Sequence, residues 1–165
     1  MAESDSKKVR TVVLPIDNSE HSERAFHWYV DVDMKDGDKM FFAHFFVPPP
    51  LPAMSLYHAA VKATDEYHES LQHHLDNAKK LMKKFEEKCE KAGVKYETHL
   101  ESCQDSIGAD IIKVSKHVNA DFIVIGSRGL SQVRRTILGS VSEYVVHHSR
   151  IPVIIVPPEQ PINPF

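Results

Sequence analysis

Residues 120–140 read ADFIVIGSRGLSQVRRTILGS, and this stretch is the most informative about the fold. It begins with a nearly continuous apolar run, Asp121–Ile125, which is typical of a strand covered on both faces of a parallel sheet. Three glycines follow, and the last, Gly139, stands directly before Ser140 and a helical pattern with Val141 and Val145 on one face. The stretch therefore indicates a strand, a glycine-containing loop and a helix in direct succession.

The rest of the chain repeats this order of strand and helix. Alternation with helix-length connections implies parallel strands joined by right-handed crossovers. We expect a single α/β domain over residues 1–165, with tails at 1–8 and 157–165, built as a Rossmann-like open five-stranded parallel sheet with helices on both faces. The other predicted strands are Val9–Ile16, Lys39–Val47, Val94–Leu100 and Pro152–Val156, and helical periodicity covers Ser19–Val32, Ser55–Ala92 and Ile107–Val118.

The longest helical pattern, Ser55–Ala92, carries one continuous apolar stripe. Every step along the stripe is three or four residues, as expected for one face of a helix, and Gly93 then supplies a stop. The stripe consists of Leu56, Ala60, Ala63, Tyr67, Leu71, Leu75, Ala78, Met82, Phe85, Cys89 and Ala92.

A ligand site is expected beyond the carboxyl ends of the strands, where the order of an open parallel sheet reverses. Glycines let backbone N–H groups approach an anion, and a helix N-terminus adds a favourable dipole. Ser140 is expected to be both the N-cap and a phosphate donor, with Arg128, Arg134 and Arg135 supplying positive charge. Neither GxxxxGK[ST] nor GxGxxG occurs. On the residues alone, three turn glycines and an N-cap serine remain the alternative.

The spacing G-x2-G-x9-G-[ST], from Gly126 to Ser140, resembles the ATP-binding signature of the universal stress protein family. Residues 12–22 (VVLPIDNSEHS) are similar to that family's first strand and acidic-serine turn, and residues 139–158 to its last helix and strand. The resemblance covers roughly Lys8 to Val156. It implies the strand order 3-2-1-4-5 and ATP, with Mg²⁺, as the ligand. The turn at residues 101–105 (ESCQD) departs from the family, since many members carry a glycine there.

The resemblance also implies a set of nucleotide-binding residues and no catalytic residue. Asp17 would face the ribose or act as an indirect metal ligand, through Mg²⁺ on the phosphates, and Phe45 would make a backbone contact to adenine. Residues 126–129 would frame the ribose and phosphates, and residues 139–142 would close on the triphosphate. The implied binding residues are Pro15, Ile16, Asp17, Phe45, Gly126, Ser127, Arg128, Gly129, Gly139, Ser140, Val141 and Ser142.

Composition argues against several other classes of function. A formal charge of −3 and a pI near 6.4 leave no basic field for nucleic-acid binding. No 18-residue apolar run occurs and residues 1–8 are polar, so we expect a cytoplasmic protein without a membrane span. Two cysteines make neither a disulfide framework nor a zinc site. The eleven histidines include no HExxH motif, which favours a solvated helix face over a metal site.

These observations favour an ATP-binding, homodimeric stress-response protein in which the nucleotide biases conformation or partner binding. A slow ATPase or phosphotransferase is the enzymatic alternative, but no general base is evident beside the proposed phosphates. A nucleotide-independent scaffold or chaperone-like protein is the third. The dimer is expected through Pro152–Val156, an edge strand that is apolar on both faces. In the alternative, a monomer, residues 157–165 cover that edge.

Overall fold

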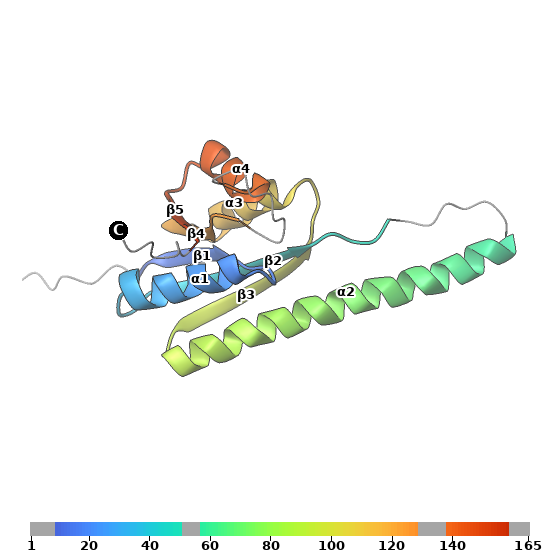
Figure 1. The fold of residues 1–165 in the computed structure, drawn as a ribbon, viewed down its shortest axis with the longest axis horizontal. Coiled ribbons are helices and arrows are strands. Elements are labelled where there is room, and N and C mark those ends of the chain that lie inside the picture. Colours follow the sequence, from blue (N-terminus) through green and yellow to red (C-terminus); the bar gives the residue numbers. More distant parts are fainter. Residues whose placement is uncertain (1–8, 51–56, 129–137, 159–165) are drawn as a thin grey trace, which may run out of the picture.

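A computed structural model describes residues 9–50, 57–128 and 138–158, with residues 57–63 described by their backbone alone. Strands and helices alternate along the chain as the sequence predicts (Figure 1). A π-helical turn, Tyr29–Asp33, continues the first helix. The elements are β1 (Thr11–Pro15), α1 (Glu20–Trp28), β2 (Lys39–Phe46), α2 (Tyr57–Ala92), β3 (Lys95–Ser102), α3 (Ile107–His117), β4 (Phe122–Gly126), α4 (Ser140–His148) and β5 (Val153–Val156).

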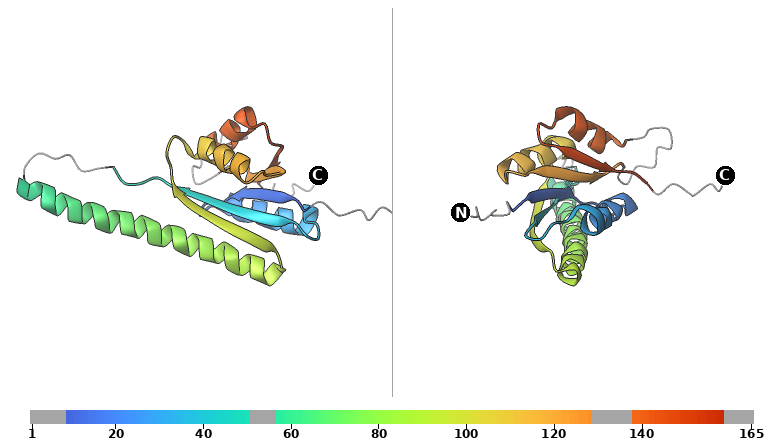
Figure 2. Two further views of the ribbon diagram at one scale, coloured as in Figure 1. Left: turned by 180° about the vertical axis from the view of Figure 1, so that it is seen from behind. Right: turned by 90° about the vertical axis from the view of Figure 1, so that its left-hand side faces the viewer.

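The strands form one parallel sheet in the order β3-β2-β1-β4-β5, which confirms the predicted order and fold class. β1 is central: Val13 lies opposite Phe41 of β2 on one side and Ile123 of β4 on the other. Figure 2 shows α1 and α2 covering one face of the sheet and α3 and α4 covering the other. The strand order reverses between β1 and β4, so ligands are expected at the carboxyl ends of these strands.

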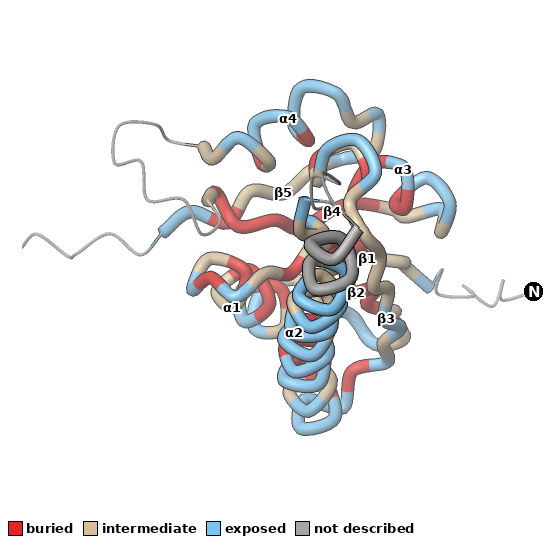
Figure 3. Tube along the Cα trace, turned by 90° about the vertical axis from the view of Figure 1, so that its right-hand side faces the viewer, coloured by how far each residue is buried: buried red, intermediate tan, exposed pale blue. Residues whose placement is uncertain are grey.

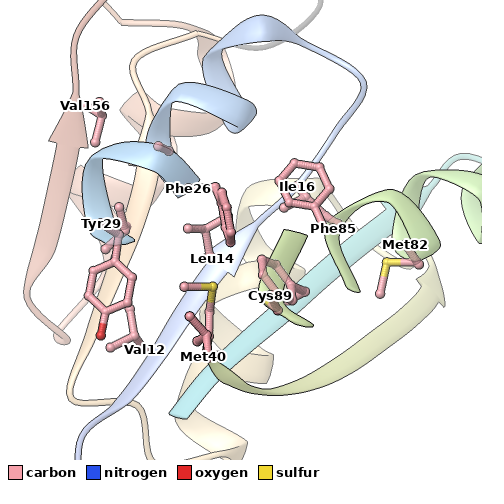
Figure 4. Packing of buried hydrophobic residues seen from close by; sticks show 14 of the residues in the cluster. Val12, Leu14, Ile16, Phe26, Tyr29, Met40, Met82, Phe85, Cys89 and Val156 are labelled. Carbon is pink, nitrogen blue, oxygen red and sulfur yellow. The ribbon is translucent and has the colours of Figure 1, made fainter. Parts of the chain in front are cut away.

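The larger core lies between the sheet and helices α1 and α2 (Figure 4). Tyr29, Phe42 and Phe85 are its largest fully buried side chains. The ring of Phe42 lies 5.5 Å from that of Phe85 and 6.0 Å from that of Phe26. A second core, on the side of α3 and α4, is built from β-branched residues and phenylalanines: Val13, Phe41, Phe45, Ile111, Val114, Ile123, Ile125 and Val145.

Helix ends follow the expected local signals in part. Ser19 is the N-cap of α1 and accepts a hydrogen bond from the backbone N–H of Ser22. Gly93 takes a φ of +66°, a left-handed conformation suited to ending α2. The prediction that Ser140 is an N-cap is wrong. Gly139, with an extended backbone, is the N-cap, and Ser140 is the first residue of α4.

A buried polar network closes the amino ends of β1 and β2. Arg10 donates from Nε and Nη2 to the two carboxylate oxygens of Asp38, at 2.9 and 2.5 Å. Tyr29 donates its hydroxyl to the same carboxylate at 2.5 Å, and the N–H of Lys35 donates to it at 2.8 Å. Burial by itself raises the pKa of Asp38, but these hydrogen bonds outweigh burial and hold that pKa at about 2.

Helix α2 is much longer than the sheet it packs against. Among its described side chains, the buried ones begin at Ala78, and residues 64–77 are all exposed or partly exposed. Figures 1 and 2 show its N-terminal half projecting beyond the sheet in opposite views. In Figure 3, viewed along the helix, most of the coloured turns of α2 have the pale blue of exposed residues.

Candidate functional site

A cavity of about 340 Å³ opens at the carboxyl ends of β1, β2 and β4. The N-terminal turns of α3 and α4 form its other walls. This is the reversal point of the strand order, where an open parallel sheet places its ligands. The lining residues are Pro15, Ile16, Asp17, Ser22, Ala43, His44, Phe45, Val47, Ile107, Ile111, Ile125, Gly126, Arg128, Gly139, Ser140, Val141 and Ser142.

Ten of the twelve implied nucleotide-binding residues line this cavity, and Ser127 and Gly129 are the exceptions. Ser127 is adjacent but buried, with an exposed fraction of 1%. Gly129 lies outside the described residues, as do Arg134 and Arg135. Segments far apart in the sequence, the β1 turn, the end of β2 and the two glycine segments, therefore meet around one cavity.

The cavity has an apolar part that the sequence prediction largely missed. Its lining includes Ala43 and Phe45 of β2, Ile107 and Ile111 of α3, and Ile125 of β4. Ile107 and Ile111 are one helical turn apart, directly after the N-cap Ser106. This pattern, an N-cap serine followed by two isoleucines one turn apart, is visible in the sequence. It is also typical of any helix that packs on a sheet, so it did not indicate a cavity.

The polar part begins at the β1 turn. Asp17 Oδ1 accepts hydrogen bonds from the backbone N–H and the hydroxyl of Ser19, the first at 3.0 Å. The carbonyl oxygen of Asp17 accepts from the hydroxyl of Ser22 at 2.7 Å. Asp17 therefore holds the start of α1, and within the described residues its Oδ2 makes no hydrogen bond. One carboxylate oxygen is thus available to a ligand while the other is structural.

His44 lines the cavity but is not among the predicted site residues. Its Nδ1 lies 2.8 Å from the carbonyl oxygen of Ile16. A carbonyl only accepts, so Nδ1 carries the proton and Nε2 is the ring nitrogen left for other partners. The hydrogen bond joins β2 to the β1 turn and fixes the wall of the cavity next to Asp17.

The two glycine segments are joined by the carbonyl oxygen of Ser127. It accepts hydrogen bonds from the N–H of Gly139 at 2.7 Å and from the hydroxyl of Ser142 at 2.8 Å. The N–H of Ser127 donates to the carbonyl of Val156 at 2.9 Å. Ser127 Oγ is buried and has no partner among the described residues. Ser127 thus locks the end of β4 to α4 and to β5.

The N-terminus of α4 lies at the cavity without a capping side chain. Gly139 has no side chain to offer as a cap, and the hydroxyl of Ser142 donates to carbonyl oxygens instead. The first N–H groups of a helix have no partner within that helix, and their dipole favours an anion. Because Ser140, Val141 and Ser142 line the cavity, this end of α4 can bind a negatively charged group there.

Positive charge near the β4 end comes from Arg128, which lines the cavity. Burial lowers the pKa of the neighbouring His21 below its ordinary value of 6.5, and the charges of Arg24 and Arg128 lower it further. His21 is therefore mainly neutral at pH 7, and among the described lining residues the fixed charges are those of Arg128 and Asp17.

Two other kinds of site have no support within the described residues. No group of three or more His, Cys, Asp and Glu side chains there is arranged to hold a metal ion directly. None of the helices in those ranges is long and apolar enough to span a membrane. A single carboxylate such as Asp17 suits a magnesium ion that keeps its waters and is held mainly by phosphates.

Comparison with known proteins agrees with the fold. A family model described as the universal stress protein family matches residues 8–157. A putative universal stress protein of Staphylococcus saprophyticus is 31% identical over 154 residues, covering 92% of this chain and 85% of that protein.

Three solved structures share the architecture. Hypothetical protein MJ0577 superposes with a TM-score of 0.75 at 21% identity, covering 92% of this chain and 98% of the other. A universal stress protein family protein of Arabidopsis thaliana, solved with AMP bound, gives 0.62 at 20% identity, covering 93% and 97%. A universal stress protein in complex with cAMP gives 0.53 at 23% identity, covering 90% and 96%.

Proposed function

The chain belongs to the universal stress protein family, and we propose that it binds ATP as a regulatory ligand in the cavity at the carboxyl ends of β1, β2 and β4. In this proposal the nucleotide biases the protein toward one conformation, which a partner then recognises. Relatives of the same fold that bind AMP or cAMP support an adenine nucleotide as the ligand class.

The observation that carries the proposal is the division of the cavity into an apolar slot and an anion-binding end. Ala43, Phe45 and Ile111 supply an apolar surface suited to a flat base. The uncapped N-terminus of α4, with Arg128 beside it, supplies N–H groups and positive charge suited to phosphates. About 340 Å³ lies within the usual range of small-molecule sites, roughly 300–1,000 Å³.

Asp17 has a specific place in this proposal. Its Oδ2 would accept a hydrogen bond from a ribose hydroxyl or hold a water of phosphate-bound Mg²⁺, while Oδ1 keeps the start of α1 in place. Neither task activates a water for attack on a phosphate. The lining arginine is permanently charged and is no base. We therefore expect hydrolysis to be slow or absent.

The enzymatic alternative rests on metal-activated water near Asp17. ATP turnover of about 1 per second or faster that disappears in Asp17→Asn would support that alternative. Turnover far below this rate in both proteins supports a ligand role.

The proposal includes a homodimer through β5. This strand has one neighbour in the sheet, β4, and its other edge is open within the described residues. Val153 and Ile155 pack against the core under α3 and α4, while Ile154 packs against the core under α1 and α2. Two copies paired antiparallel across a two-fold axis would satisfy the open backbone groups.

The deciding experiment is titration calorimetry with ATP on wild type and Gly139→Val. Gly139 has a φ of −80°, which valine adopts readily, so this variant adds bulk beside the helix N-terminus without backbone strain. Ala92→Val, on an exposed residue at the far end of α2, is the matched control. If Gly139→Val loses ATP binding while Ala92→Val and the wild type keep it, the proposed site at the N-terminus of α4 is supported. Equal affinity in all three proteins contradicts it.

A further inference from the structure

A second cavity, of about 550 Å³, lies between α2 and the carboxyl ends of β1 and β2. The turn after β1 contributes Asp17 and Asn18 to its lining, and α2 contributes Lys80 and Lys84. Because α2 covers the face of the sheet opposite α3 and α4, this cavity and the proposed nucleotide cavity lie on opposite sides of the sheet edge (Figure 2).

The two cavities meet at Asp17 and His44, which line both of them. Nδ1 of His44 is held by the carbonyl oxygen of Ile16, so Nε2 is the ring nitrogen left for a ligand. In the proposed function, Asp17 Oδ2 accepts a hydrogen bond from a ribose hydroxyl. The ribose then lies at the junction of the cavities, and a group on its other hydroxyl has the second cavity beside it.

Charge indicates which kind of group the second cavity binds. Lys84 forms an ion pair with Glu23 of α1, which also pairs with Lys88. Lys80 is exposed and has no ion-pair partner among the described residues. Its ammonium is a point charge with three donors, which suits the oxygens of a phosphate.

Two further lining side chains have polar atoms to offer beside Lys80. The side-chain amide of Asn18 makes no hydrogen bond within the described residues. Nδ1 of His74 lies 2.8 Å from the carbonyl oxygen of Ser70, which leaves Nε2 of that ring for a ligand. The second cavity therefore offers a cation and an amide donor at a distance from the uncapped N-terminus of α4, where the 5′ phosphates are expected.

We propose that the bound adenine nucleotide carries a phosphate on its ribose 2′ or 3′ oxygen, and that the second cavity binds this phosphate through Lys80 and Asn18. The free ribose hydroxyl donates to Asp17, so the carboxylate and the added phosphate take different oxygens of the sugar. This inference rests on the proposed function, because it takes the position of the ribose from Asp17. The number of phosphates on the 5′ oxygen depends on the first cavity alone.

Titration calorimetry with AMP, adenosine 3′,5′-bisphosphate and adenosine 2′,5′-bisphosphate tests the proposal. AMP has the base, ribose and 5′ phosphate of both bisphosphates and lacks only the ribose phosphate. We expect one bisphosphate to bind about tenfold more tightly than AMP, and the tighter one identifies the ribose oxygen. ADP carries its second phosphate at the 5′ end and controls for added charge alone.

Variants of two neighbouring lysines locate the effect. Lys80→Gln should bring the preferred bisphosphate to the affinity of AMP, because glutamine cannot supply the charge, while the ratio of ADP to AMP affinity stays as in wild type. Lys79→Gln is the matched control, since Lys79 is exposed and lines neither cavity. It should keep the full preference.

Two results would overturn this inference and leave the nucleotide cavity in place. In one, AMP binds as tightly as both bisphosphates. In the other, Lys79→Gln removes the preference as completely as Lys80→Gln. If the wild-type protein binds none of these nucleotides and no ATP, the proposed function itself is wrong, and this inference fails with it.

Discussion

A Cβ atom on Gly126 would stand 2.6 Å from the carbonyl oxygen of His21, so β4 and the first turn of α1 meet without room for a side chain. From the sequence, Gly126 was expected to let the backbone come close to a bound phosphate. The structure adds a packing requirement that holds without any ligand. Because the obstructing atoms belong to the backbone of His21, they cannot move aside as the end of a flexible side chain could.

We expect Gly126→Ala to lower the free energy of unfolding by about 1–3 kcal/mol, the usual cost of overpacking. Urea unfolding measures this, with Lys91→Ala, on an exposed residue of α2 far from this contact, as the control. Nucleotide affinity of the folded protein should change little. If Gly126→Ala were as stable as wild type but unable to bind ATP, glycine would be needed at this position for the bound phosphate and not for packing against His21.

Filling the cavity should block the nucleotide. Val141 lines the cavity from the first turn of α4, so Val141→Trp places an indole in the space proposed for the ligand. We expect at least tenfold weaker ATP binding, about 1.4 kcal/mol or more, by calorimetry. Val146→Trp on the same helix is the control, because Val146 is 40% exposed and does not line the cavity. Equal affinities in the two variants would remove the nucleotide from this cavity.

Mutation can distinguish the structural role of Asp17 Oδ1 from the proposed ligand-binding role of Oδ2. Asp17→Asn retains an acceptor for the N–H of Ser19 and removes only the charge. We expect it to keep wild-type stability and to weaken ATP binding by about tenfold, or ~1.4 kcal/mol. Asp17→Ala should bind similarly and also lose about 1 kcal/mol of stability, because the turn before α1 loses its acceptor. Thermal unfolding and calorimetry on both variants test this, and a stability loss in Asp17→Asn equal to that in Asp17→Ala would contradict it.

The fold was predictable from the sequence because its signals are local. Strand runs, N-cap Ser19 and the stop at Gly93 each act within a few residues, and family resemblance gave the strand order. The cavity was only partly predictable. The glycine spacing pointed to its polar end, but Ile107 and Ile111 look like ordinary core residues until the helix is placed against β2. The N-cap was misplaced by one residue because serine is the commoner cap, whereas Ser142 here bonds to carbonyls.

Acid should destabilise the protein through Asp38. Its pKa is about 2 in the folded state against an ordinary 3.8, so its ion pair stabilises the fold fully above pH 4. That contribution, about 2 kcal/mol from a shift of nearly two pKa units, is lost as the pH falls through 2. Asp38→Asn should flatten the pH dependence of unfolding between pH 4 and 2. Asp36→Asn, on an exposed neighbour, should not, and identical profiles for the two variants would contradict the role of Asp38.

The open edge of β5 gives a prediction about how copies of the chain assemble. The carbonyls of Pro152 and Val156 accept hydrogen bonds from the N–H groups of Ile123 and Ser127 in the β4 segment. Backbone groups alternate along a strand, so those of Val153 and Ile155 point to the open edge. Val153→Pro removes one outward N–H and leaves the bonds to β4 intact, at the first residue of the strand, where proline is tolerated.

The wild-type chain should sediment as a dimer at tens of micromolar. Adding Val153→Pro should make it a monomer, because the proline removes one backbone donor and its ring obstructs a neighbouring strand. Ile154→Pro is the matched contrast: it removes an N–H that faces β4, so it should lower the stability of the folded chain as well. A wild-type chain that is monomeric at this concentration would show that the β5 edge is not an interface between copies.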